Sequence, residues 1–232
     1  MLWSDMDLAI PMFVALIVVV DPLGVAPMFI GLTGGATPAA RRRIAIRATL
    51  IAGLVLFAFG AFGGPMLRAL GVGLPAFRIA GGILLLLAAI DMLFARPSGL
   101  RATTASEDQE AIQRADVSVF PLAIPLIAGP GAITTVMLQV SAAHAAPRDL
   151  AILAATLAVV LALSLLSMLF SALLMRLLGI TGINVVGRVL GIVLAALAVQ
   201  LVIDGIAESG LVPGPGFDLG PMPPPGPPTG IG

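Results

Sequence analysis

Residues 12–32 read MFVALIVVVDPLGVAPMFIGL, an apolar run whose one charged residue, Asp21, is followed directly by Pro22. About 20 helical residues cross the roughly 30 Å hydrocarbon core of a bilayer, so this run predicts a transmembrane helix. Pro22 is the central residue of the run. Because proline removes a backbone donor and clashes with the preceding turn, we predict that this helix is broken near the bilayer midplane.

The rest of the chain is similarly apolar. Hydrophobic residues make up 59% of the 232 residues and charged residues only 10%, whereas soluble domains carry about 25% charged residues. Five further spans are predicted at residues 48–67, 79–95, 117–143, 150–175 and 185–206. These segments lack the apolar–polar alternation of barrel strands. We therefore expect an all-α membrane protein with six transmembrane helices.

The distribution of arginine predicts the orientation. All twelve cationic residues are arginine. Nine of them fall in the first, third and fifth connections when Arg188, near the start of the last predicted span, is counted with the fifth connection. Positively charged connections stay in the cytoplasm. We therefore expect these three connections to be cytoplasmic and both termini to lie outside.

The two halves of the chain align on each other. Residues 66–72 (MLRALGV) match residues 174–180 (LMRLLGI) at an offset of 108, which also carries Pro22 onto Pro130. Each half has three spans, an odd number, so the second half is expected to be inverted, as in many secondary transporters. The predicted parts are a first three-helix repeat, a charged cytoplasmic loop, an inverted second three-helix repeat and a disordered Pro/Gly-rich tail. Their bounds are 1–95, 96–116, 117–210 and 211–232.

The fourth predicted span has a matching break at its centre, Gly129-Pro130-Gly131. Half-helices that begin at such breaks present free N–H groups and the positive end of a helix dipole. A small zwitterion fits this arrangement, with its carboxylate on the N–H groups and its ammonium on carbonyls or on Asp21. The predicted substrate-binding residues are Asp21, Pro22, Gly24, Gly129, Pro130, Gly131 and Thr134. Two alternatives stay open: the breaks are only packing kinks, or Asp21 only caps the half-helix that follows it.

Further polar residues are candidates for gating or coupling. They are Arg78, Arg188, Asn184 and Gln200. The alternative is structural, because arginines near helix ends extend toward the headgroups or form ion pairs, and amides hydrogen-bond neighbouring helices. Three serines share one face of the fifth predicted span, where small residues favour close helix packing. They are Ser164, Ser167 and Ser171.

At the two breaks the sequence resembles the MarC family, also called the small neutral amino acid transporter family. The matching stretches are residues 21–24, 27, 32–33, 77–82, 121–134, 183–184, 188–200 and 205–206. This resemblance implies six transmembrane helices in the bacterial inner membrane and transport of small neutral amino acids such as glycine and alanine. Together with the arginine distribution, it predicts that both termini are periplasmic. Gly187 departs from the family pattern, which has threonine before the arginine.

The composition argues against several function classes. Cysteine is absent and His144 is the one histidine, so we expect no metal site and no cofactor. Neither a nucleic-acid surface nor a phosphate-binding GxxxxGK[ST] motif is recognisable. The preferred function is a secondary transporter in the lipid bilayer, not an enzyme, with a coupling proton or Na⁺ and a homo-oligomer left open. The alternatives are a non-transporting membrane subunit and an intramembrane enzyme.

Overall fold

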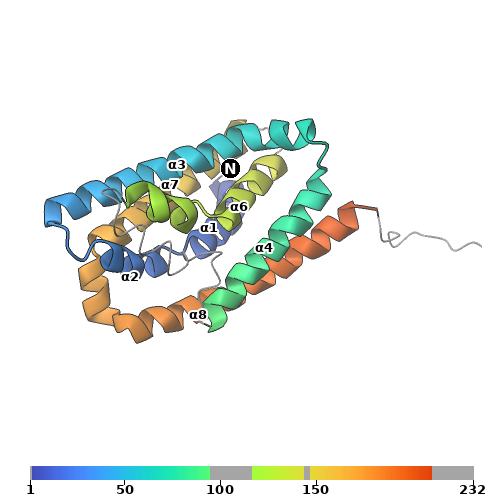
Figure 1. Cartoon of the computed structure of the whole chain (residues 1–232). Helices are drawn as coiled ribbons and strands as arrows, with labels where there is room; N and C mark the ends of the chain where they lie inside the picture. Colours follow the sequence, from blue (N-terminus) through green and yellow to red (C-terminus); the bar gives the residue numbers. More distant parts are fainter. Residues whose placement is uncertain (1, 95–116, 144–146, 211–232) are drawn as a thin grey trace, which may run out of the picture.

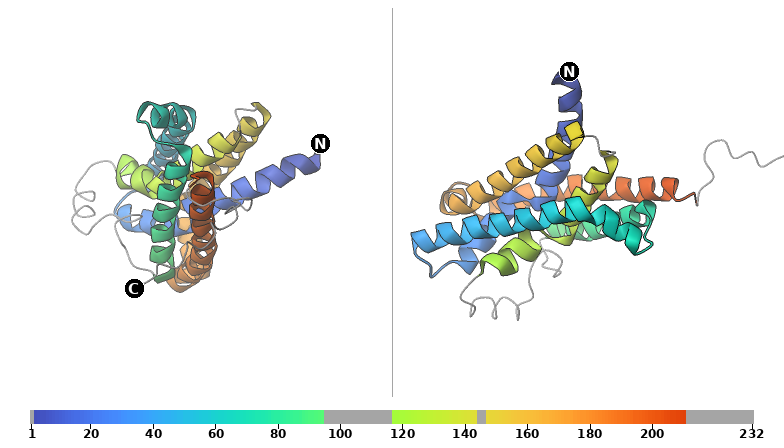
Figure 2. Two further views of the ribbon diagram at one scale, coloured as in Figure 1. Left: turned by 90° about the vertical axis from the view of Figure 1, so that its right-hand side faces the viewer. Right: turned by 90° about the horizontal axis from the view of Figure 1, so that it is seen from above.

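The computed structural model describes residues 2–94, 117–143 and 147–210, and every regular element in these ranges is helical. The elements are α1 (Leu2–Val20), α2 (Pro22–Leu32), α3 (Pro38–Ala69), α4 (Leu74–Phe94), η1 (Ser118–Ile127), α6 (Pro130–Ala142), α7 (Pro147–Leu169) and α8 (Ser171–Glu208). They form one bundle, from which the beginning of α1 projects (Figures 1 and 2). The predicted loop 96–116, His144 and the predicted tail 211–232 lie outside the described residues.

The described helices account for the predicted spans. Five are long and apolar enough to cross a bilayer, and η1 with α6, bent by 56° at their junction, supplies a sixth when the pair is counted as one span. The first span, Ala9–Leu32, runs through the junction of α1 and α2. Asp21 lies twelve residues from its beginning and eleven from its end, so the carboxylate is near the middle. The all-α fold and the breaks in the first and fourth spans are confirmed.

The first half of the fourth span is not a regular helix. Inside η1, Phe120 (φ −127°, ψ 127°) and Ile124 (φ −130°, ψ 123°) have extended backbone. Each precedes a proline, Pro121 or Pro125, and a proline ring disfavours the α conformation for the residue before it. The expectation of a single break at Pro130 is therefore incomplete, because the chain is already irregular ten residues earlier.

The predicted end of the fifth span, residue 175, is wrong. α7 ends at Leu169, and residues 171–178 belong to α8, which bends at Gly179 (φ 64°, ψ 176°). Glycine takes up a positive φ without the steric penalty that a side chain would bring. The last candidate span, Ser171–Glu208, includes this bend and is longer than the predicted 185–206.

Buried and exposed apolar residues mark the inside and the outside of the bundle. Leu16, Leu56 and Leu122 are fully buried at its centre. Leu50 and Leu54 of α3 are 67% and 71% exposed, although they lie within a span. In water such a face would be costly, but hydrocarbon solvates it, so this outer surface suits lipid contact.

α4 and α8 lie side by side and antiparallel (Figure 1). Glycines let their backbones approach closely. A Cβ added at Gly82 would lie 2.7 Å from the carbonyl oxygen of Ala198, and one at Gly205 would lie 2.9 Å from that of Pro75. Small residues at contact points are the usual means of packing membrane helices, because shape fit replaces the hydrophobic effect there.

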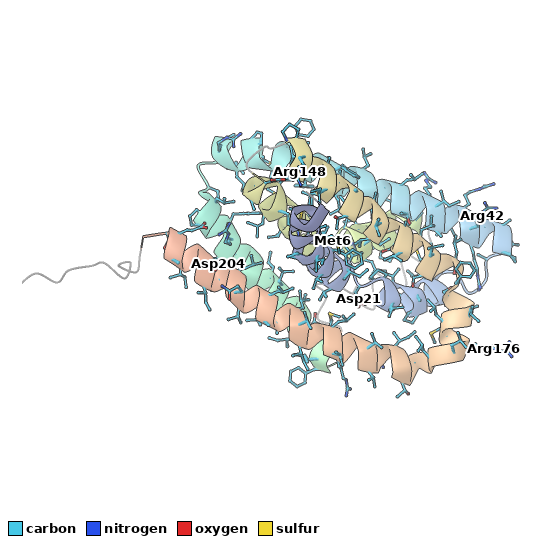
Figure 3. All side chains as sticks on the ribbon, turned by 180° about the vertical axis from the view of Figure 1, so that it is seen from behind. Met6, Asp21, Arg42, Arg148, Arg176 and Asp204 are labelled. Carbon is cyan, nitrogen blue, oxygen red and sulfur yellow. The ribbon has the colours of Figure 1, made fainter. Side chains whose placement is uncertain are left out.

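The labelled arginines gather at opposite ends of the bundle. Arg42 and Arg176 lie toward one end, and Arg148 lies toward the other (Figure 3). The first two belong to the connections predicted to be cytoplasmic, and Arg148 belongs to one predicted to lie outside. The arrangement agrees with the arginine asymmetry of the sequence.

We predict that Gly82→Ala destabilises the protein by about 1–3 kcal/mol, because the added methyl group meets fixed backbone of α8. The matched control is Gly187→Ala on α8, where an added Cβ meets nothing within 4 Å. The control should be neutral or slightly stabilising. Thermal unfolding of both variants in the same detergent measures the difference. Equal unfolding midpoints would show that the α4–α8 contact is not tight.

Candidate functional site

The first break is a single residue that caps the helix after it. Asp21 adopts a left-handed conformation (φ 49°, ψ 67°) between α1 and α2, and its Oδ1 accepts a hydrogen bond of 3.1 Å from the backbone N–H of Gly24. Pro22 occupies the first position of α2, where its missing N–H removes no helical hydrogen bond. The alternative that Asp21 caps the half-helix is confirmed, and a role for its charge stays a prediction.

The second break has a different cap. Gly129 (φ −76°, ψ 171°) precedes α6, and Pro130 is the first helical residue, as Pro22 is in α2. Gly129 supplies no side-chain hydrogen bond to the helix. The N–H groups at the start of α6 therefore have no side-chain cap, and they lie at the positive end of the helix dipole.

The fold brings the two breaks together. A Cβ added at Gly131 would lie 3.3 Å from Cγ1 of Val19, which stands two residues before Asp21, and 2.8 Å from Cδ2 of Leu85 in α4. One added at Gly129 would lie 2.5 Å from the carbonyl oxygen of Pro125. Glycine is needed at both positions because backbone and core side chains occupy the space that a side chain would take.

A cavity of about 340 Å³ opens at the first break. It is lined by Asp21 and its neighbours on one side and by α7 and α8 on the other. Ser167 of α7 lines it too, is 6% exposed, and its Oγ has no hydrogen-bond partner among the described residues. Ser164, by contrast, donates to the carbonyl of Val160 at 3.1 Å. Ser167 therefore lies beside the cavity with a buried hydroxyl, and the interpretation of the three serines as packing residues stays a prediction.

The space at the second break is much smaller. The cavity lined by Val19, Leu84 and the segment from Pro125 to Ala132 has a volume of only about 20 Å³. This is room for about one water-sized group. Any larger ligand that reaches the start of α6 requires the surrounding helices to move apart.

The remaining predicted residues lie away from these cavities. Thr134 is buried against α4, where a Cβ at Gly81 would lie 2.1 Å from its Cγ2. Arg78 forms an ion pair with Glu208, which joins the start of α4 to the end of α8. Three predicted residues are exposed on α8: Asn184, Arg188 and Gln200. Gln200 donates a 2.7 Å hydrogen bond to Asp204. The pairing of Arg78 matches the structural alternative, and Glu208 carried no signal in the sequence analysis.

Comparison with known proteins decides the family. The sequence pattern of the MarC family integral membrane proteins matches residues 6–209. This chain belongs to the MarC family. The resemblance at the breaks is thereby confirmed over nearly the whole chain, and the MarC-family protein is a multi-pass integral membrane protein in a lipid bilayer.

Several relatives of this MarC-family protein are similar over most of their length. The UPF0056 membrane protein of Archaeoglobus fulgidus is 40% identical over 197 residues, covering 84% of this chain and 91% of the relative. The UPF0056 membrane protein YvbG of Bacillus subtilis is 38% identical, covering 84% and 92%. The UPF0056 inner membrane protein YhgN of Escherichia coli K12 is 36% identical, covering 83% and 93%. No solved structure matches the chain.

We predict that Asp21→Ala lowers the stability of the MarC-family protein by about 1–2 kcal/mol, because the substitution removes the cap of α2. Asp21→Asn keeps an acceptor oxygen and suits the left-handed conformation, so its stability should stay within about 0.5 kcal/mol of the wild type. Thermal unfolding in detergent compares the three proteins. An asparagine variant as unstable as the alanine variant would mean that the charge of Asp21, and not its capping hydrogen bond, stabilises the junction of α1 and α2.

Proposed function

We propose that this MarC-family protein is a secondary transporter of small neutral amino acids, of the size of glycine or alanine, that works by alternating access around its two helix breaks. The observation that carries the proposal is that two helix breaks, one with a negatively charged group and one with hydrogen-bond donors, lie near each other. Asp21 provides a carboxylate at one break, and uncapped N–H groups begin α6 at the other. A Cβ added at Gly131 would lie 3.3 Å from Cγ1 of Val19, two residues before Asp21, which supports a shared site at the two breaks.

This pair of groups complements a zwitterion. The ammonium of an amino acid pairs with the Asp21 carboxylate, and its carboxylate accepts from the first N–H groups of α6. Ser167 lines the cavity beside Asp21, and its buried hydroxyl, which lacks a partner among the described residues, would have to turn toward the substrate to bind it. That cavity, about 340 Å³, suits a small side chain and lies at the lower end of the range for ligand pockets.

An acid at the middle of a span supports the same proposal. Burial of a carboxylate in the hydrocarbon region is costly, so such residues mark ion and substrate pathways more often than packing sites. Asp21 is 8% exposed and sits centrally in the first span. We assign it either the substrate ammonium or a coupling proton or Na⁺.

The two halves are proposed to form an inverted repeat, which supports alternating access. Pro22 and Pro130, 108 residues apart, are each the first residue of a half-helix. Gly71 (φ 71°) and Gly179 (φ 64°), at the same offset, share a left-handed backbone. Two halves with helix-starting prolines and positive-φ glycines at matched positions are expected to rock against each other about a shared central site.

Uptake into proteoliposomes tests the function. Vesicles that contain the protein should accumulate labelled glycine or alanine above protein-free vesicles. Gly131→Leu should lower this uptake at least tenfold, because the side chain fills the meeting point of the breaks. Gly187→Ala is the control, and its uptake should be unchanged, since an added Cβ meets nothing there.

Three outcomes of this assay are decisive. A folded Gly131→Leu variant with full uptake would refute the site. Absence of uptake for every small neutral amino acid would refute the function and favour a non-transporting subunit or an intramembrane enzyme. Asp21→Asn separates the two roles of the acid. If the variant loses both substrate exchange across the membrane and gradient-driven uptake, Asp21 binds the substrate ammonium. If it keeps exchange and loses only gradient-driven uptake, Asp21 binds the coupling ion.

We also propose an inner-membrane location with both termini periplasmic. The name of the Escherichia coli relative, an inner membrane protein, and the arginine asymmetry support it. The chain has no cysteine, so single substitutions are clean probes. In spheroplasts a membrane-impermeant maleimide should label Ser209→Cys, after the end of α8, and leave Ala39→Cys, at the start of α3, unlabelled until the cells are lysed. The reverse pattern would invert the topology.

A further inference from the structure

A large cavity near the end of α3 lies apart from both breaks. It has a volume of about 830 Å³ and is formed by α3, α6 and α7, and none of its lining residues lines either break cavity. Its polar side chains are Arg68 and Ser141, and every other lining residue is apolar. Ser141 donates to the carbonyl of Met137 at 2.9 Å, so its hydroxyl is already engaged. We call this cavity the Arg68 groove.

The dimensions of the Arg68 groove match one leaflet of a bilayer. Its α3 lining runs from Leu56 to Arg68, and the twelve steps between these residues correspond to about 18 Å of helix at about 1.5 Å per residue. Half of a hydrocarbon core of about 30 Å is about 15 Å. Arg68 lies in the last turn of α3 and is exposed, so its guanidinium stands at headgroup depth at one end of an apolar channel.

We propose that the Arg68 groove is a binding site for a phospholipid of net negative charge. One acyl chain lies along the apolar walls, and the phosphate accepts hydrogen bonds from the Arg68 guanidinium, whose fork of donors suits phosphate oxygens. Charge complementarity favours an anionic headgroup over a neutral one. A transmembrane helix from a second copy would cross both leaflets, whereas the groove extends through one.

The lipid contacts the helix that carries the second break. Val136 and Val140 of α6 line the groove, and α6 begins at Pro130. A bound acyl chain therefore packs between α6 and the wall formed by α3 and α7. It fills space that would otherwise be left empty in a bundle whose cohesion depends on packing.

Glycines in the wall offer a clean way to block the groove. A Cβ added at Gly64 would meet only Nη1 of Arg68, at 3.7 Å, which is ordinary contact, so Gly64→Leu projects into the groove without a backbone clash. Gly63 is unsuitable, because a Cβ there would lie 2.5 Å from Cε of Met137. Gly31→Leu is the control: Gly31 is exposed on α2, lines none of the cavities described above, and has nothing within 4 Å of an added Cβ.

Native mass spectrometry of the full chain, delipidated in detergent and titrated with phosphatidylglycerol or phosphatidylcholine of the same acyl chains, tests the proposal. The wild type and Gly31→Leu should bind the first phosphatidylglycerol at least tenfold more tightly than Gly64→Leu does. Arg68→Gln should lose the preference for phosphatidylglycerol over phosphatidylcholine. Because a ligand stabilises the state that it binds, phosphatidylglycerol should also raise the unfolding midpoint of the wild type but not of Gly64→Leu.

Several results would overturn the lipid site. Unchanged affinity of folded Gly64→Leu for the first phosphatidylglycerol is one, and an unchanged lipid preference in Arg68→Gln is another. The second variant alters an exposed side chain, so it decides the matter even if Gly64→Leu does not fold. A change from dimer to monomer in Gly64→Leu with unaltered lipid affinity would assign the groove to a second copy. None of these readouts depends on amino acid transport.

Discussion

A backbone polar group in hydrocarbon must find a partner inside the protein, and the arrangement of this bundle follows from that constraint. Two of its spans are interrupted near their centres, which for a spanning helix is the depth of the hydrocarbon core. At the first break the carboxylate of Asp21 takes the N–H of Gly24 as its partner. At the second, Val19 and Leu85 close over Gly131 and leave space for little more than a water. The helices around the breaks are placed so that neither break faces lipid alone.

The sequence predicts those features that depend on local chemistry. Pro22 and Pro130 stand where a proline must begin a helix, and the structure starts α2 and α6 at these residues. The same local reasoning extends to Phe120 and Ile124, whose extended backbone follows from the prolines after them, although only the central break was predicted. Backbone irregularity is readable in a membrane protein because proline and glycine act on their immediate neighbours.

The direction in which a side chain faces is harder to predict. In a soluble helix the polar face points to water, but in a bilayer both the core and the lipid side are apolar, so periodicity gives a weak signal. For that reason the sequence did not predict that Asn184, Arg188 and Gln200 are exposed on α8, apart from the cavities described above. Nor did it predict that Ser167, on a small-residue face, lines a cavity. The partner of Arg78, Glu208, is 130 residues away in the chain, and only the tertiary fold brings them together.

The glycine contacts between α4 and α8 also limit how these helices can change length. Gly82, Gly191 and Gly205 each face fixed backbone of the other helix, so the contacts must stay in register along both. One residue inserted between Gly191 and Gly205 would turn everything beyond it by about 100°, because a helix has about 3.6 residues per turn. Gly205 would then leave the contact, and a bulkier neighbour would take its place. The spacing between the contact residues is therefore fixed on both helices, and an insertion in one helix has to be matched by an insertion in the other.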